Sequence, residues 1–330
     1  MILRWCLVML ALIAFGETRG RSQTVNSVAN ADLGKIAAAA AGDTRFHVAP
    51  AGGLVTKLSG NGARVSPGTG NIFVTVSCGN SGFCDNQNML VAIGQTGTPT
   101  NRAYALENFT VSTSGASATI ATTPTTGNSI SFQVGPIGRN SSKTFYIGYD
   151  FVVKGDSSGA SSGNSAASLS VTISRTNGNS PSTLSGTVSA SVFRTLVAGA
   201  TQAMSFGMIS RPRAGPGLVT LAPGATSVVT SGDGVSPRPG STATSAVVGV
   251  TGEGGQSVSV SVPTSFTMYG PGGSTIEVTP DPDISGSVTL SGSLGSAGST
   301  TVTIGGSFPL STGTATGAYA GSFPVIFQYN

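Results

Sequence analysis

The chain has 330 residues and a formal net charge of +4, and only 8% of its residues are charged, against a typical value of about 25%. Its 48 glycines and 17 prolines, with Ser and Thr supplying most of the polarity, argue against a helical protein, because helix surfaces are normally built from Glu, Lys, Arg and Gln. A hydrophobic content of 38% argues against disorder. These numbers predict an all-β chain of short strands and turns, and the length favours two folded units.

The first residues of the chain predict a signal peptide, residues 1–16. Arg4 precedes an unbroken apolar run, Trp5–Phe15, that is too short to span a bilayer. Small residues, Ala14 and Gly16, stand where a signal peptidase cleaves, so we expect cleavage after Gly16 and an exported chain. The alternative is a buried strand or a short core helix. The sequence has no later apolar stretch long enough for a transmembrane helix, so we expect no transmembrane segment after cleavage.

Residues 17–44 form the next region. Ser27–Gly42 is rich in alanine, which predicts a short helix, and its small apolar face suits a loosely held leader equally well. The expected leader is therefore flexible or weakly helical. We expect it to precede the first sandwich.

Residues 45–189 show short alternating segments that predict a first β-sandwich. Gly155–Ser165 contains mainly Ser and Gly, which predicts a flexible polar loop. The strands expected before this loop are Ile72–Cys78, Met89–Ile93, Leu106–Val111, Ser129–Val134 and Thr144–Val153, and the strand expected after it is Ser168–Ser174.

Two cysteines of this first sandwich, Cys78 and Cys84, remain after the signal peptide takes Cys6 away. The five residues between them include two glycines that permit a tight turn. An exported chain meets an oxidising compartment, where a disulfide is the default. A metal pair lacks further ligands, and a redox pair is more often spaced C-x-x-C. The spacing therefore predicts a disulfide between Cys78 and Cys84.

Residues 190–330 repeat the pattern and predict a second β-sandwich, so the fold class is two tandem immunoglobulin-like sandwiches. Gly-Pro turn signals, such as Gly270–Gly273, separate the strands. The expected strands are Phe206–Ile209, Leu218–Leu221, Ala246–Val250, Ser257–Val262, Ser274–Val278, Val288–Leu294, Thr300–Ile304 and Phe323–Tyr329.

The residue inventory favours a non-enzymatic protein without metal or cofactor. His47 is the only histidine, so no two-histidine metal site can form, and a serine-type triad would depend on this one side chain, which a strand-start surface position explains more simply. Asp281 and Asp283 have no third acid nearby and are interpreted as a polar turn. The cations are scattered without a Lys/Arg run, so the basic balance does not predict binding to nucleic acid.

The last fourteen residues, Gly317–Asn330, alternate between an apolar and a small or polar face. Pro324 removes one backbone donor on the second face, which suits a strand with one unpaired edge. The sequence therefore predicts an amphipathic last strand whose apolar face consists of Tyr319, Gly321, Phe323, Val325, Phe327 and Tyr329.

This segment resembles the last strand of subunits of chaperone–usher fimbriae, which has alternating apolar residues, a penultimate Tyr and a Gly fourteen residues from the end. Tyr329 and Gly317 stand at those two positions. The section from Ala203–Gly207 through Tyr319–Phe323 is also similar to a bacterial envelope family, domain of unknown function 4402, over roughly residues 195–330. The first sandwich shows no family resemblance.

The fimbrial resemblance implies a pilin-like second sandwich that lacks its final strand and accepts one from a partner. A periplasmic chaperone, an usher and other fibre subunits are the implied partners, and the chain would pass through the periplasm to the cell surface. Such assembly is β-augmentation, in which main-chain bonds give affinity and alternate side chains fill pockets. The residues that it would involve are Gly317, Tyr319, Phe323, Val325, Phe327 and Tyr329.

The position in such a fibre follows from residues 17–44, which do not provide an extended alternating donor segment. The layout therefore resembles a tip adhesin, whose outer domain, residues 45–189, would bind a host or surface glycan or protein. Tyr104, Tyr146 and Tyr149 could stack on a sugar, although the alternation places at least Tyr149 in the core.

One alternative stays open. If Gly317–Asn330 is the ordinary last strand of a complete sandwich, the protein is a free secreted carbohydrate- or protein-binding module. A secreted hydrolase is disfavoured, because the chain has a single histidine and no paired acids near a recognisable motif.

Overall fold

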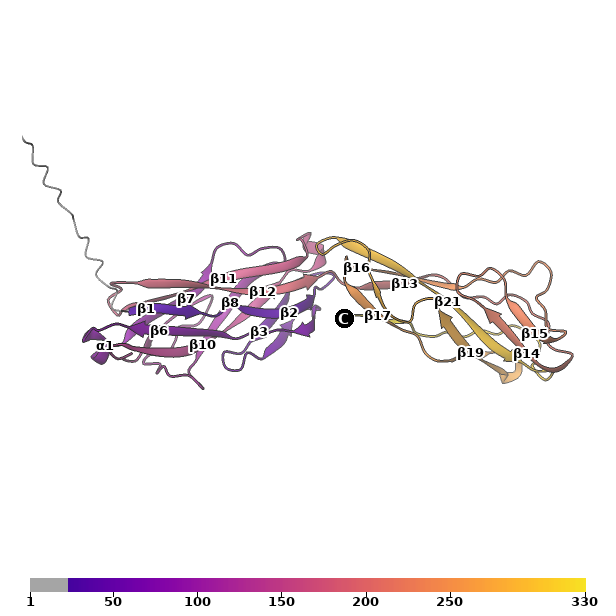
Figure 1. Ribbon diagram of the computed structural model, residues 1–330, viewed down its shortest axis with the longest axis horizontal. Helices are drawn as coiled ribbons and strands as arrows, with labels where there is room; N and C mark the ends of the chain where they lie inside the picture. Colours follow the sequence, from indigo (N-terminus) through magenta and orange to yellow (C-terminus); the bar gives the residue numbers. More distant parts are fainter. Residues whose placement is uncertain (1–22) are drawn as a thin grey trace, which may run out of the picture.

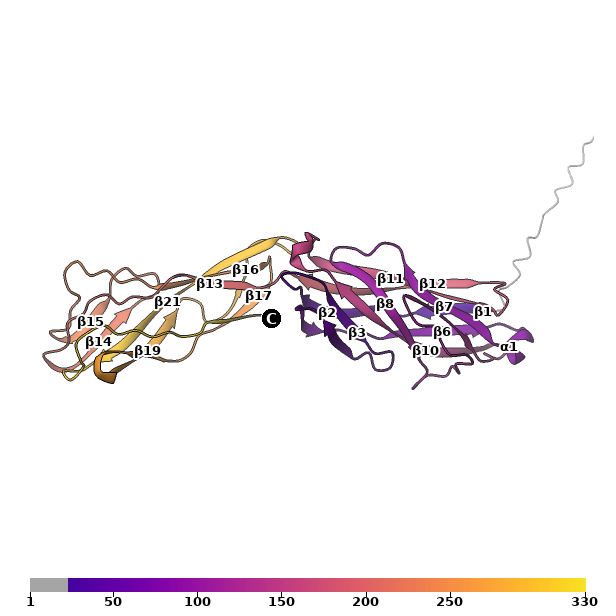
Figure 2. The same cartoon turned by 180° about the vertical axis from the view of Figure 1, so that it is seen from behind.

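A computed structural model describes residues 23–330, so the expected signal peptide and its cleavage after Gly16 lie outside the described residues. The fold is all-β and forms two β-sandwich-like halves that lie end to end in an elongated molecule (Figures 1 and 2). None of the helices within residues 23–330 has the length and hydropathy that a membrane span requires.

Two six-stranded sheets form the N-terminal half, and a short helix, α1 (Phe83–Asn86), follows β6. The first sheet has the order β1 (Gln23–Val28), β6 (Ile72–Cys78), β10 (Ser141–Val153), β3 (Thr44–Val48), β4 (Val55–Ser59), with β8 (Ala103–Ser112) also paired with β10. The second has the order β5 (Ala63–Pro67), β2 (Ala31–Ala37), β12 (Ser182–Phe193), β11 (Gly163–Arg175), β7 (Met89–Thr96), β9 (Ser129–Val134).

One continuous hydrophobic core fills the space between these two sheets. Alternate residues of β10 point into it, and Phe145 meets Phe132 edge-on with ring centroids 5.6 Å apart. Tyr149 is also inside, where its hydroxyl donates to the Gly70 carbonyl at 3.0 Å and burial raises the pKa of the phenol. The prediction that Tyr149 lies in the core is confirmed.

The prediction of a flexible or weakly helical leader is wrong for residues 23–44. β1 pairs with β6, and β2 pairs with β12 and β5. Leu33 and Ile36 are fully buried three positions apart, because β2 carries an extra residue opposite β12: Asp32 pairs with Ser189 and Lys35 with Ser191, which interrupts the two-residue alternation. This bulge removes the regular alternation by which β2 could have been identified as a strand in an alanine-rich segment.

The prediction of a flexible loop over Gly155–Ser165 is also wrong. Asp156–Ser158 forms a 3-10 turn, and β11 begins at Gly163. Ser165 is fully buried, and its hydroxyl accepts a hydrogen bond from the Arg102 backbone at 3.1 Å. The Ser and Gly residues are therefore used for close packing at the junction of the two halves.

A seven-stranded and a three-stranded sheet form the C-terminal half. The larger sheet has the order β13 (Val197–Gln202), β16 (Ala246–Glu253), β21 (Ala297–Leu310), β14 (Ala214–Leu221), β15 (Val229–Asp233), with β19 (Thr275–Pro282) beside β21 and β18 (Phe266–Tyr269) beside β19. The smaller has the order β20 (Gly286–Thr289), β17 (Ser257–Ser261), β22 (Ile326–Tyr329).

Three expected strands of this half are wrong or too long, and one of them, Phe323–Tyr329, is described with the C-terminal segment below. Phe206–Ile209 forms no strand and is held by isolated bridges at Ser205 and Ile209. The strand expected over Val288–Leu294 ends at Thr289, where a turn carries the chain toward β21.

Candidate functional site

The C-terminal segment lies at the edge of the three-stranded sheet. β22 pairs with β17, with Phe327 opposite Val260 and Tyr329 opposite Val258, and across residues 23–330 no strand pairs with its other side. Residues 321–325 belong to no strand, and Ala320 makes only an isolated bridge to Tyr269. The predicted fourteen-residue strand is therefore wrong in length, and four residues of it form a β-ladder.

The apolar side chains of this segment all face the protein, as their alternation predicts. Phe323, Val325 and Phe327 pack against a cluster of buried residues, Ala246, Val248, Val260, Val302 and Ile304, but all three remain only partly buried. Phe323 also stacks on Phe266, with centroids 4.6 Å apart. A row of half-covered apolar side chains thus runs from the unpaired segment 321–325 into β22, whose second edge has no strand partner within residues 23–330.

Tyr319 and Gly317 fix the path of the chain before that row. The Tyr319 hydroxyl lies 2.9 Å from the Ser274 hydroxyl and donates to the Ala315 carbonyl at 2.9 Å. Gly317 has a φ of +147°, and a Cβ at this position would collide with the Pro271 ring. The glycine is therefore needed for the close approach of two chain segments, a local reason that does not involve a partner.

Tyr329 lies at the junction of the two halves, where the C-terminus is marked in the middle of Figure 1. Its hydroxyl donates to the Arg194 carbonyl at 3.0 Å and accepts from the Glu253 backbone at 2.7 Å. Its ring packs against Phe193 with centroids 5.5 Å apart. Burial raises the pKa of this phenol, mainly because the charged form would lose its water. Tyr329 therefore joins the C-terminal strand to the linker between the halves, residues 194–196, which connects β12 to β13.

The linker is also held by two acidic side chains that the sequence analysis did not single out as site residues. Fully buried Glu253 accepts hydrogen bonds from the backbone of Arg194 at 3.1 Å and of Gly295 at 2.5 Å. Asp156 accepts from the Thr195 backbone at 2.9 Å. These acids stand alone among Ser and Gly in the sequence, so no local motif marks them.

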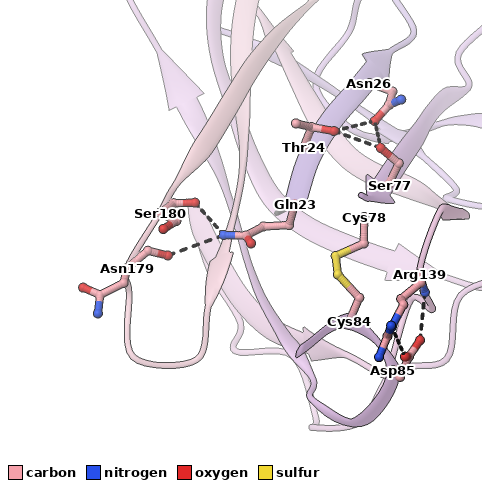
Figure 3. Close-up of a disulfide and its surroundings, with 10 residues drawn as sticks. All are labelled: Gln23, Thr24, Asn26, Ser77, Cys78, Cys84, Asp85, Arg139, Asn179 and Ser180. Carbon is pink, nitrogen blue, oxygen red and sulfur yellow. Dashed lines mark hydrogen bonds and ion pairs between the residues drawn. A yellow bond between two sulfur atoms is a disulfide. The ribbon is translucent and has the colours of Figure 1, made fainter. Parts of the chain in front are cut away.

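A disulfide joins Cys78 and Cys84, as their spacing predicts, at the end of the N-terminal half that lies away from the junction (Figures 1 and 3). Beside it, Arg139 forms an ion pair with Asp85 at 2.6 Å. The Arg139 backbone N–H also donates to Asp85 and holds the pKa of this carboxyl below its ordinary value. Gln23 donates to the Ser180 carbonyl at 2.5 Å and ties the start of β1 to the β11–β12 turn.

Residues 196–329 match the family described as "Domain of unknown function (DUF4402)", which confirms that resemblance for the C-terminal half. No curated protein matches the chain. Among solved structures, a chaperone–tip adhesin complex of CFA/I fimbriae biogenesis matches 91% of this chain and 97% of that chain, with 8% identity and a TM-score of 0.24. The collagen-binding subdomain ACE19 of an Enterococcus faecalis surface protein matches 37% and 87%, with 7% identity and a TM-score of 0.17. Both likenesses are too low to support an argument about function.

Proposed function

We propose that the protein is a non-enzymatic subunit of an exported surface fibre, and that an extended segment of another chain pairs with the open side of β22. The observation that supports this proposal is the row of Phe323, Val325 and Phe327, half-covered beside a strand edge that is unpaired within residues 23–330.

The backbone of β22 can accept such a segment. The Asn330 N–H donates to the Ser257 carbonyl of β17 at 3.1 Å. Because donors and acceptors alternate between the two sides of an antiparallel strand, the N–H and C=O groups of Phe327 and Tyr329 point away from β17. An incoming strand would pair with these groups and cover an edge that otherwise invites aggregation.

Burial of the half-covered row would also stabilise an incoming strand through the hydrophobic effect. Full burial of a large apolar side chain stabilises by about 1.5–3 kcal/mol relative to full exposure, so three partly buried residues and the strand's own apolar face supply several kcal/mol. A periplasmic chaperone, an usher or a neighbouring subunit are the partners that this geometry suits.

A position at the tip of the fibre, as an adhesin, suits the N-terminal half. Residues 23–37 pair within the sheets of that half as β1 and β2, so they are not available to complete a neighbouring subunit. The ligand of a tip subunit would then bind the surface of the N-terminal half.

Photo-crosslinking in the native envelope tests this proposal. A photoreactive amino acid replaces Ile326, which is 60% exposed on β22. The matched control replaces Leu58, which is 57% exposed on β4. This strand is also at the edge of a sheet, but it belongs to the N-terminal half, whose core is continuous. We expect Ile326 to crosslink to an extended, alternating apolar segment of another chain, which mass spectrometry would identify.

Two results would overturn the proposal. Crosslinks from Ile326 that do not exceed those from Leu58, or a chain recovered only as an uncrosslinked monomer, would leave the free secreted binding module as the better interpretation.

A further inference from the structure

We propose that the N-terminal half binds a neutral sugar ring at the seam where β8 meets β9, through Glu107 and Asn108. The proposal deepens the adhesin part of the proposed function, because it gives the ligand a site and a chemical class. It does not depend on strand pairing at β22, so the two proposals can fail separately.

The site is built on a buried carboxylate on the outer face of the first sheet. Asp150 is only 2% exposed, although the neighbouring residues Tyr149 and Phe151 occupy the core side of β10. Its oxygens accept hydrogen bonds from His47 Nδ1 at 2.8 Å and Asn108 Nδ2 at 2.8 Å. A side chain that serves only solubility would not be covered in this way, so Asp150 acts as a fixed anchor for the groups above it.

Arg45 links this anchor to Glu107. One guanidinium nitrogen lies 3.3 Å from Asp150, and the other lies 2.7 Å from Glu107 Oε2. The fork geometry holds the Glu107 carboxylate in place without neutralising the pair of acids, so the two carboxylates and one guanidinium keep a net negative charge.

A β-bulge turns Asn108 toward the anchor. The register between β8 and β10 shifts between the Gly148–Thr110 and Asp150–Glu107 pairs, so that Asn108 and Phe109 together face one residue of β10. Asn108 has a φ of +51°, a left-handed conformation that costs energy for a residue other than glycine. Bulges of this kind re-aim side chains and are common next to functional sites.

A depression of about 280 Å³ adjoins Glu107 at this seam. Its polar lining includes Gln95, Asn128 and Ser129, and Leu106 and Ala105 supply apolar surface. Binding sites for drug-sized ligands usually span about 300–1,000 Å³, so this depression suits a ligand of about one ring.

Unused hydrogen-bonding groups define the ligand. Glu107 Oε1 and the Gln95 amide nitrogen, both in the lining of the depression, and Oδ1 of the adjacent residue Asn108, which lies outside that lining, have no partner in the described part of the chain. Carboxylate and amide oxygens accept from hydroxyl groups, and an amide nitrogen donates to them. Adjacent hydroxyls on a sugar ring present both roles, and the net negative charge disfavours an acidic sugar.

Saturation-transfer NMR on the full exported chain tests the site, with glucose, galactose, N-acetylglucosamine and N-acetylneuraminic acid as separate probes. We expect a signal from at least one neutral sugar at millimolar concentration and none from N-acetylneuraminic acid. Glu107→Gln and Asn108→Gly should each weaken binding at least tenfold, because the first removes the charge and the second removes the amide while suiting the left-handed backbone.

Two further variants keep the test decisive. Asn128→Ala changes an exposed lining residue whose side chain makes no hydrogen bond within residues 23–330, so it should weaken binding without affecting folding. Glu277→Gln, an exposed carboxylate on β19 of the other half, should leave binding unchanged. Absence of any neutral-sugar signal, preference for the acidic sugar, or equal binding by all four variants would overturn the proposal, whatever the crosslinking at β22 shows.

Discussion

The two halves are built from similar Val-, Ser- and Gly-rich strands, yet they bury their apolar faces to different degrees. In the N-terminal half, two sheets enclose one core in which residues such as Val74, Ile147 and Val171 have no exposed surface. In the C-terminal half, the buried residues form three smaller clusters, one of which includes Phe193 at the junction, and large side chains packed against them, such as Phe206 and Phe266, stay only partly buried.

The difference follows from how many strands cover each core. Each sheet of the N-terminal half has six strands, whereas only β20, β17 and β22 form the second layer of the C-terminal half. A sandwich excludes water only when both inner faces are covered. The three-stranded layer therefore leaves some apolar side chains of this half partly exposed to solvent. Composition alone therefore does not decide whether a β-sandwich is complete.

The largest expected difference comes from truncating one phenylalanine in each half. Phe145→Ala should destabilise the N-terminal half by about 3–5 kcal/mol, because the ring is fully buried and leaves a cavity against Phe132. Phe327→Ala should cost about 1–2 kcal/mol, because a half-covered ring has less transfer energy to lose. Calorimetry of both variants measures the two values, and equal costs would contradict the comparison.

The alternation of side chains predicted much of the fold but not the pairing of its strands. β6 and β9 have the bounds expected from the sequence, because both of their faces are regular. Phe323 and Val325 face inward as expected, yet they lie in an unpaired segment, since an extended chain alternates whether or not a neighbour bonds to it. Only the arrangement of the other strands decides which edges stay open.

The two candidate sites were predictable to different extents. Tyr329 stood out as penultimate, but its contacts with Arg194 and Glu253 join residues far apart in sequence and carry no local pattern. The polar site of the N-terminal half left one signal, a single acid, Asp150, in the otherwise apolar stretch Phe145–Val153. Its partners came from β3 and β8 and could not be identified without the register.

A smaller effect is expected where the halves meet. Tyr329→Phe keeps the ring against Phe193 but removes the hydroxyl that serves the Glu253 N–H and the Arg194 carbonyl. Leaving buried groups unpaired costs about 1–3 kcal/mol. We expect the two halves to unfold more independently, seen as a wider separation of their calorimetric transitions, while crosslinking from Ile326 persists. Loss of crosslinking with unchanged transitions would instead place Tyr329 in the assembly surface.

The smallest effect concerns acid stability at the disulfide end of the N-terminal half. Hydrogen bonds from Arg139 lower the pKa of Asp85 below its ordinary value of 3.8, so the folded state favours the charged carboxylate. A lowered pKa stabilises the fold above the ordinary value, and this contribution disappears as the pH falls through the folded value. Asp85→Asn should therefore lower the melting temperature of the N-terminal half slightly at neutral pH and not at all well below pH 4. Because the pair is exposed, salt should weaken the effect at neutral pH. Melting curves of both proteins across this range measure it, and a difference that grows toward acid would show that Asp85 stabilises the half in its protonated form.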